Sequence, residues 1–117
     1  MAITIEYATL DNVTVGATEL SIVSGTTTLQ TVTDDGVYQL FVDDQGNMTK
    51  TEEYAIRIYE KVHNGGTKKQ IFKATIKGVQ SEPFVAPSLM LGNGWDMTIQ
   101  KLAGTDRAFD ARISRVS

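Results

Sequence analysis

The sequence predicts an all-β domain, a single antiparallel β-sandwich of roughly seven to nine short strands with little or no helix. Three observations support this prediction. Apolar and polar residues alternate with a period of two in most segments, turn residues interrupt them at short intervals, and no segment sustains the 3.6-residue period of a helix. A jelly roll and an immunoglobulin-like sandwich share this pattern, so the strand order stays open.

Length and composition narrow the class of protein. The 117 residues suit one domain, residues 1–117, and the absence of cysteine excludes disulfides and thiolate metal ligands. The net charge is −3, with no basic run of the kind that binds nucleic acid. No apolar run approaches the roughly 20 residues that span a bilayer, and we see no signal peptide. We expect assembly in a cytoplasm, without nucleic acid or membrane as partners.

The first third of the chain contains two predicted strands and a threonine-rich stretch. Residues 3–10 alternate apolar and polar side chains, and Asp11-Asn12 follows as a turn signal. Residues 18–24 form the second predicted strand. Residues 26–33 are mostly threonine, which favours a solvent-exposed edge strand or loop over a helix.

Residues 37–42 are the most apolar early segment, and both faces of the expected strand carry apolar side chains. Such a strand is typical of a position between two layers. A polar loop over residues 43–47 follows. Thr49 and Glu52 then match the spacing of a capping box, which indicates a one-turn helix at residues 49–53.

A β-hairpin is predicted from two alternating segments, residues 54–62 and 68–77. They flank His63-Asn64-Gly65-Gly66, and Asn-Gly supplies the positive φ angles of a tight turn.

Residues 95–116 predict a second hairpin, which turns at residues 103–106 and contains the only tryptophan. Six residues form its inward faces: Trp95, Met97, Ile99, Phe109, Ala111 and Ile113. We therefore expect this hairpin to be the centre of the core, with Asp96 and Thr98 on its polar face.

Residues 78–94 contain both prolines, which argues against a central strand. The segment is nevertheless too apolar for a free loop. We expect an ordered crossover packed on the core, with residues 88–91 pairing as a short strand. An exposed part of it would mark a protein contact surface.

No catalytic, cofactor or metal site is predicted. His63 is the only histidine, so neither a usual catalytic triad nor a zinc site is available. Asp34-Asp35 and Asp43-Asp44 are interpreted as turn residues, and residues 43–47 lack the ligand pattern of a calcium loop. Gly92-Asn93-Gly94 matches no phosphate loop.

Two groups of cations and three tyrosines have either a binding role or a structural one. The cations form either a polymer-binding face or the polar face of exposed strands. The groups are Lys68, Lys69, Lys73 and Lys77, and Arg107, Arg112 and Arg115. Tyr38, Tyr54 and Tyr59 fit the core or its rim better than a base-stacking platform, which wants a basic groove.

Several segments resemble small structural-region proteins of tailed bacteriophages. They are Gly36–Asp43 (GVYQLFVD), Arg57–Lys61 (RIYEK), Gly92–Arg107 (GNGWDMTIQKLAGTDR) and Arg112–Val116 (RISRV). A second tryptophan expected near Phe109 or Ala111 is missing here. The resemblance covers roughly residues 36–117 and carries no catalytic motif. It implies a virion component assembled in the host cytoplasm, most directly a capsid decoration (cement) protein.

The partners that this resemblance implies are the major capsid protein or other virion proteins, and further copies of the chain in a homo-oligomer such as a trimer. Two modes of contact are expected, strand pairing at an edge and apolar packing at an oligomer axis. The candidate contact residues are Ile3, Ile5, Thr28, Thr31, Phe84, Val85, Leu89 and Met90.

Three alternatives stay open. In the first alternative, the chain is a head–tail connector, tail or fibre-associated β domain, which would have fewer copies per particle than a decoration protein. A carbohydrate- or surface-binding module would need an exposed aromatic cluster, for which Tyr7, Tyr59 and Trp95 are the candidates. An enzyme is the least favoured class, because no reactive groups converge in the sequence.

Overall fold

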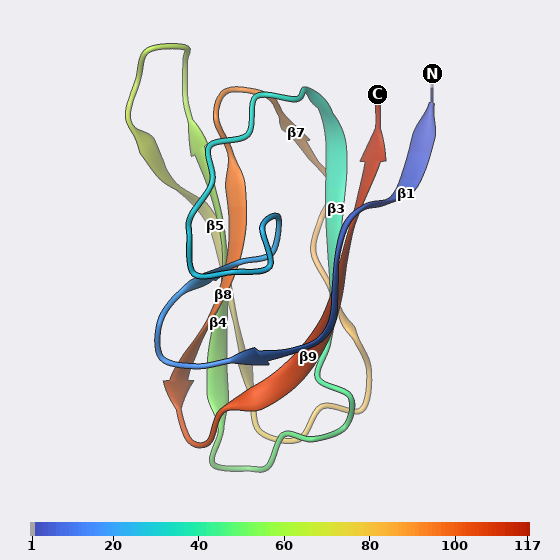
Figure 1. The fold of residues 1–117 in the computed structure, drawn as a ribbon, viewed down its shortest axis with the longest axis vertical. Coiled ribbons are helices and arrows are strands. Elements are labelled where there is room, and N and C mark those ends of the chain that lie inside the picture. The colour runs from blue at the N-terminus through green and yellow to red at the C-terminus, as the bar shows by residue number, and fades with distance from the viewer. Residues whose placement is uncertain (1) are drawn as a thin grey trace.

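The computed structural model describes residues 2–117, which form nine strands and no helix (Figure 1). The strands are β1 (Ile3–Val15), β2 (Leu20–Ser21), β3 (Gly36–Asp43), β4 (Glu53–Lys61), β5 (Lys68–Lys77), β6 (Phe84–Val85), β7 (Leu89–Leu91), β8 (Asp96–Ala103) and β9 (Arg107–Val116). The all-β prediction is confirmed. The one-turn helix predicted at residues 49–53 is wrong, because the chain makes only a turn there.

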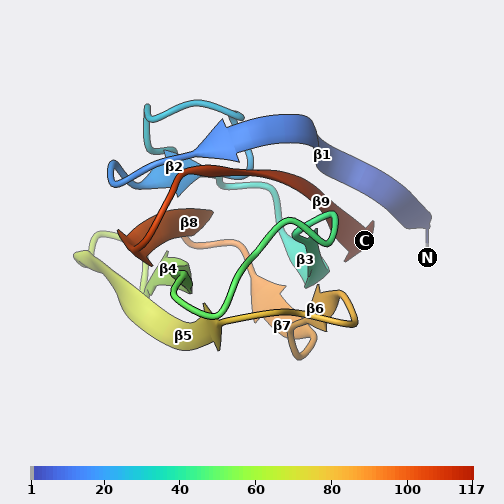
Figure 2. The same ribbon diagram turned by 90° about the horizontal axis from the view of Figure 1, so that it is seen from below.

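Two antiparallel sheets pack face to face as a sandwich (Figures 1 and 2). The first sheet has the order β1-β9-β3-β6, and β7 pairs with β3 beside β6. The second sheet has the order β2-β8-β4-β5. The predicted β4–β5 hairpin is confirmed, and so are the ordered crossover and its short strand β7.

The predicted hairpin at residues 95–116 is wrong. β8 pairs with β2 and β4 in the second sheet, whereas β9 pairs with β1 and β3 in the first. The turn after β8 therefore carries the chain from one sheet to the other (Figure 2). The alternation of apolar and polar residues predicts which side chains point inward, and this prediction is confirmed for the six residues named. It does not predict whether two successive strands pair with each other or face each other across the core.

Two aromatic contacts connect the sheets. Tyr38 of the first sheet packs on Trp95, the residue just before β8 of the second sheet. Their ring centroids are 4.4 Å apart, and both side chains are fully buried. Tyr54 of the second sheet meets Phe109 of the first edge to face at 4.7 Å. The Trp95 indole N–H and the Tyr38 hydroxyl donate to the same acceptor, the Asp34 carbonyl, at 3.0 Å and 2.8 Å. Trp95 thus lies in the core as predicted.

Strands β1 and β3 differ from their predictions. Asp11-Asn12 is not a turn, because β1 continues to Val15 through a register shift at which Asn12 has a φ of 55°. β3 was expected between two layers, but only its alternate residues face the core. Val37 and Phe41 point away from the core, on an outer face that no second layer formed by residues 2–117 covers.

A buried ion pair holds the crossing from β8 to β9. Glu52 is only 1% exposed, and its carboxylate accepts hydrogen bonds from the Arg107 side chain and the Thr49 amide, each at 2.6 Å. The Thr49–Glu52 contact is thus the predicted capping-box hydrogen bond, made without a helix. Burial alone would raise the pKa of Glu52, but these hydrogen bonds and the Arg107 charge together lower it.

We predict that Glu52→Gln makes stability less dependent on acid pH. A lowered pKa means that the stabilisation by ionised Glu52 is complete above its unfolded-state pKa and is lost as the pH falls through the folded-state value. The melting temperatures of wild type and Glu52→Gln should therefore differ most near neutral pH and converge in acid. Glu82→Gln, an exposed control, should follow wild type. Parallel curves for wild type and Glu52→Gln would contradict the prediction.

Two glycines with similar φ angles provide a matched test of the turn from β8 to β9. Gly104 has a φ of +91°, and a Cβ there would lie 2.5 Å from Cγ of Glu52. Gly65 has a φ of +88°, with nothing within 4 Å of the same position. Both alanine variants carry the backbone strain, so we expect Gly104→Ala to lose about 1–3 kcal/mol more than Gly65→Ala through overpacking. Urea unfolding measures the difference, and equal losses would refute the clash.

Candidate functional site

The outer face of the first sheet carries a continuous line of apolar side chains. Ile3 lies directly opposite Val116, Val116 opposite Val37, and Val37 opposite Met90, so the line crosses β1, β9, β3 and β7. Directly opposed residues point to the same side of a sheet. Ile3 is 65% exposed, Val37 37% and Met90 83%. We call these four residues the apolar row.

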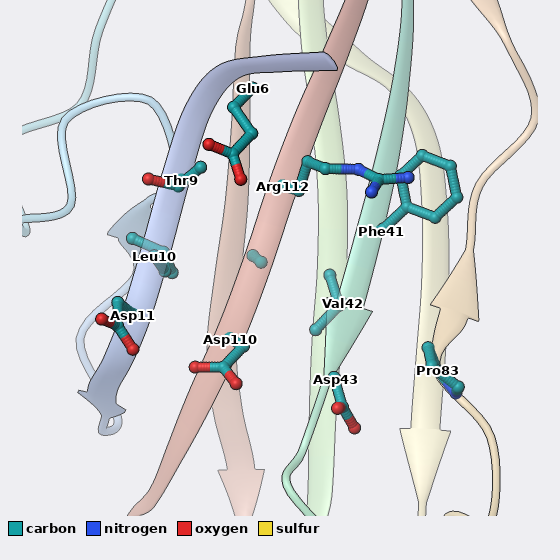
Figure 3. Close-up of a pocket in the computed structure, with 11 residues that line it drawn as sticks. Glu6, Thr9, Leu10, Asp11, Phe41, Val42, Asp43, Pro83, Asp110 and Arg112 are labelled. Carbon is teal, nitrogen blue, oxygen red and sulfur yellow. The ribbon is translucent and has the colours of Figure 1, made fainter.

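A hollow of about 550 Å³ lies on the same face, along β1, β9 and β3 (Figure 3). Four carboxylates line it: Glu6, Asp11, Asp43 and Asp110. We call it the acidic hollow. Arg112 is its only cationic residue, and the guanidinium carbon stands 4.0 Å from the centroid of the Phe41 ring. The Arg112 Nε is buried and has no hydrogen-bond partner within residues 2–117.

The carboxylates of the hollow are bound by neutral groups only. The Asn12 backbone N–H and the Gln45 side-chain amide each donate to Oδ1 of Asp110 at 2.8 Å. The Gln45 backbone N–H donates to Asp43 at 3.2 Å. Within the described chain, no lysine or arginine forms an ion pair with any of the four. Across residues 2–117 no group of three histidines, cysteines or acidic residues is arranged to hold a metal ion. The arrangement suits binding of a cationic surface.

The structure brings some predicted contact residues onto this face. Ile3 and Met90 belong to the apolar row, and Ile5 is 54% exposed two residues further along β1. Val85 is 49% exposed and lies opposite Phe41 beside the acidic hollow. Two further candidates are half-buried and pack against the core: Phe84 and Leu89.

Thr28 and Thr31 lie elsewhere, in a loop against the second sheet. Residues 26–33 make isolated bridges rather than a continuous strand, so both threonines are exposed without offering a long free edge. Asp96 anchors this loop. Its carboxylate accepts hydrogen bonds from the Ser21 hydroxyl at 2.7 Å and the Gln30 amide at 2.8 Å.

Asp96 and Thr98 are fully buried, contrary to the polar face predicted for them. The backbone of Gln30 binds Asp96 where the sequence pattern implied solvent, and the Thr98 hydroxyl donates to Glu19. Burial raises the pKa of the Asp96 carboxyl, and the hydrogen bonds from Gln30 and Ser21 only partly oppose this shift.

Sequence reasoning missed most of the acidic hollow and half of the apolar row. The signal for Val37 and Phe41 was present, because residues 37–42 are apolar on both faces. That pattern was interpreted as burial between two layers. Neither Val116 nor the four carboxylates carried a local signal, because cross-strand pairing alone makes them neighbours.

The three aromatic residues that a sugar-binding module would need do not form an exposed cluster. Trp95 is buried, and Tyr7 packs edge to face on Tyr38 with ring centroids 5.3 Å apart. Tyr59 lies in the second sheet and donates to Glu19 at 2.7 Å. Burial, supported by this Glu19 contact, raises the pKa of Tyr59 to about 12.

Comparison with known proteins gives little further information. No family model matches the sequence, and neither does any curated protein. A solved structure described as Eiger TNF from S. frugiperda is similar with a TM-score of 0.42 and 16% identity. The match covers 78% of this chain and 66% of that one, so this chain spans just under two thirds of the other's length. The likeness is too weak to carry a functional argument. The part of the chain that the structure describes contains no helix suited to crossing a membrane.

We predict that Asp96→Ala destabilises the fold by about 2–4 kcal/mol. The substitution leaves the buried Ser21 hydroxyl and the Gln30 backbone N–H without their acceptor. An unsatisfied buried polar group costs about 1–3 kcal/mol. Urea unfolding followed by the fluorescence of the single tryptophan measures the loss. The exposed Asp11→Ala serves as the control and should change stability little. Equal effects of the two substitutions would show that Asp96 does not hold the loop.

Proposed function

We propose that this chain is a non-enzymatic assembly protein that binds a protein partner through the apolar row. The supporting observation is the row itself, which crosses four strands on a sheet face without a covering layer. Exposed apolar side chains arranged contiguously are typical of protein contact surfaces. Burial of the row against a partner would remove its apolar area from water, which favours association.

We further propose that the partner is the major capsid protein of a tailed bacteriophage and that the chain is a decoration protein of the virion. The support is the sequence resemblance of residues 36–117 to small phage structural proteins. A decoration protein acts by binding the assembled shell and stabilises it by mass action. Such a role requires an exposed surface and no catalytic group.

A head–tail connector, tail or fibre-associated domain is the alternative location within a virion. Copy number separates the two, with hundreds of copies expected for a decoration protein and about a dozen or fewer for a connector. A cryo-EM map of the particle, together with quantitative gel analysis, reads both copy number and position. Absence of the chain from the particle would refute the virion assignment.

We predict that Val37→Asp combined with Met90→Asp weakens binding to particles lacking the chain by at least roughly tenfold. Two unpaired carboxylates would then be buried at the contact, and a tenfold loss corresponds to about 1.4 kcal/mol. Val62→Asp is a control for an added carboxylate away from the row, because Val62 is 82% exposed in the loop between β4 and β5. It should bind like wild type. Unchanged occupancy by the double variant would exclude the apolar row as the contact.

A further inference from the structure

The lysines of this chain are confined to one side of the sandwich. No strand of the first sheet contains lysine, and all seven lysines lie in the second sheet or in the turn before β4: Lys50, Lys61, Lys68, Lys69, Lys73, Lys77 and Lys101. Four of them belong to β5, which lies on the opposite side of the molecule from β1 (Figure 2). The acidic hollow and the lysine-rich strand therefore face in different directions.

Two lysines of β5 are free to bind outside the molecule. Lys73 and Lys77 are exposed, and they alternate with inward Phe72 and Ile76, so they share the outer face of the second sheet. Lys73 lies directly opposite another cation, Arg57. Within residues 2–117 neither lysine forms an ion pair.

The acidic hollow presents the complementary arrangement. Asp43 lies directly opposite Asp110 on the neighbouring strand, which places two like charges side by side. Like charges in directly opposed positions destabilise a sheet. A cation between them would convert this repulsion into attraction. Within residues 2–117 no cation, Arg112 included, forms an ion pair with either aspartate.

The distance between the two lysines is similar to the distance between the carboxylates at the two ends of the hollow. Lys73 and Lys77 are four residues apart along an extended strand, or about 13 Å. Glu6 falls in the β1 segment between the Thr4–Arg115 and Ala8–Ile113 pairs. Relative to Asp110 it therefore lies three to five residues along β9, which is roughly 10–17 Å. Two lysines on one face of a strand can thus reach both ends of the hollow.

We propose that the acidic hollow of one copy receives Lys73 and Lys77 of a second copy, so that the chain associates with itself head to tail. The contact joins two different surfaces, and repetition of such a contact closes a ring or extends a chain. It does not use the apolar row and so goes beyond the proposed function. Loss of particle binding and loss of self-association are separate outcomes.

Sedimentation velocity tests the proposal on the full chain. At low salt the average mass of wild type should rise with concentration up to the millimolar range. High salt should reverse the rise, because the screening length falls from about 30 Å at 0.01 M salt to about 3 Å at 1 M. A wild type that stays monomeric at every concentration in low salt would overturn the proposal, even if a lysine-rich segment of another protein binds the hollow.

A pair of complementary variants makes the test specific to head-to-tail contact. Asp43→Asn with Asp110→Asn removes the two directly opposed charges of the hollow and keeps the side-chain oxygens that accept hydrogen bonds. Lys73→Glu with Lys77→Glu removes the opposite surface. Each variant alone should be monomeric. An equimolar mixture should form dimers that do not extend, because one intact hollow and one intact lysine pair remain between them. A mixture that stays monomeric would refute the contact.

Lys69→Glu provides the matched control. It makes the same type of substitution at a single position on the same strand, so compared position by position the change of charge is equal. Lys69 lies beyond the irregularity at Ile71 and opposite Glu60, which turns it to the other face. This variant should self-associate like wild type. A loss equal to that of the Lys73 and Lys77 variant would mean that only net charge matters, and would contradict a specific contact. Circular dichroism melts confirm that every variant is folded.

Discussion

The packing of Trp95 on Tyr38, with both side chains hydrogen-bonded to the Asp34 carbonyl, is the contact on which the sandwich most depends. It joins β3 of the first sheet to the residue just before β8 of the second, and it satisfies both polar atoms without exposing either ring. Burial of a tryptophan removes 150–250 Å² or so of surface from water, which contributes about 4–6 kcal/mol as an upper estimate. Asp34 lies in the chain that leads from the threonine-rich loop into β3, so the same contact also fixes where β3 begins.

This shared core leaves each sheet with one outer face, and the two outer faces differ. The loop anchored by Asp96 covers part of the second sheet, and a polar network around Glu19 ties Tyr59, Thr98 and Arg57 together there. None of the described residues covers the first sheet in a comparable way, so its outward side chains form the apolar row and the acidic hollow. An exposed face of this kind is chemically suited to association, and its groups are spread along strands rather than gathered around a reacting atom.

The two surfaces are independent in chemistry and adjacent in space. The apolar row gains from desolvation, which is insensitive to salt, whereas the acidic hollow gains from charge attraction, which salt screens. A chain that binds another kind of protein through one surface and its own copies through the other would form a network on a shell. Ionic strength would then change the links between copies more than the link to the shell.

The sequence by itself determined the secondary structure and the inward faces, because period-two alternation and turn residues act locally. Trp95, Ile99 and Phe109 are buried as predicted, and the hairpin from β4 to β5 follows from its Asn-Gly turn. Tertiary structure alone decided that β8 and β9 belong to different sheets, since alternation is the same for paired strands and for strands facing across a core. It also decided the candidate site. Asp43 and Asp110 are far apart in sequence, and they meet only because β3 and β9 pair in one register.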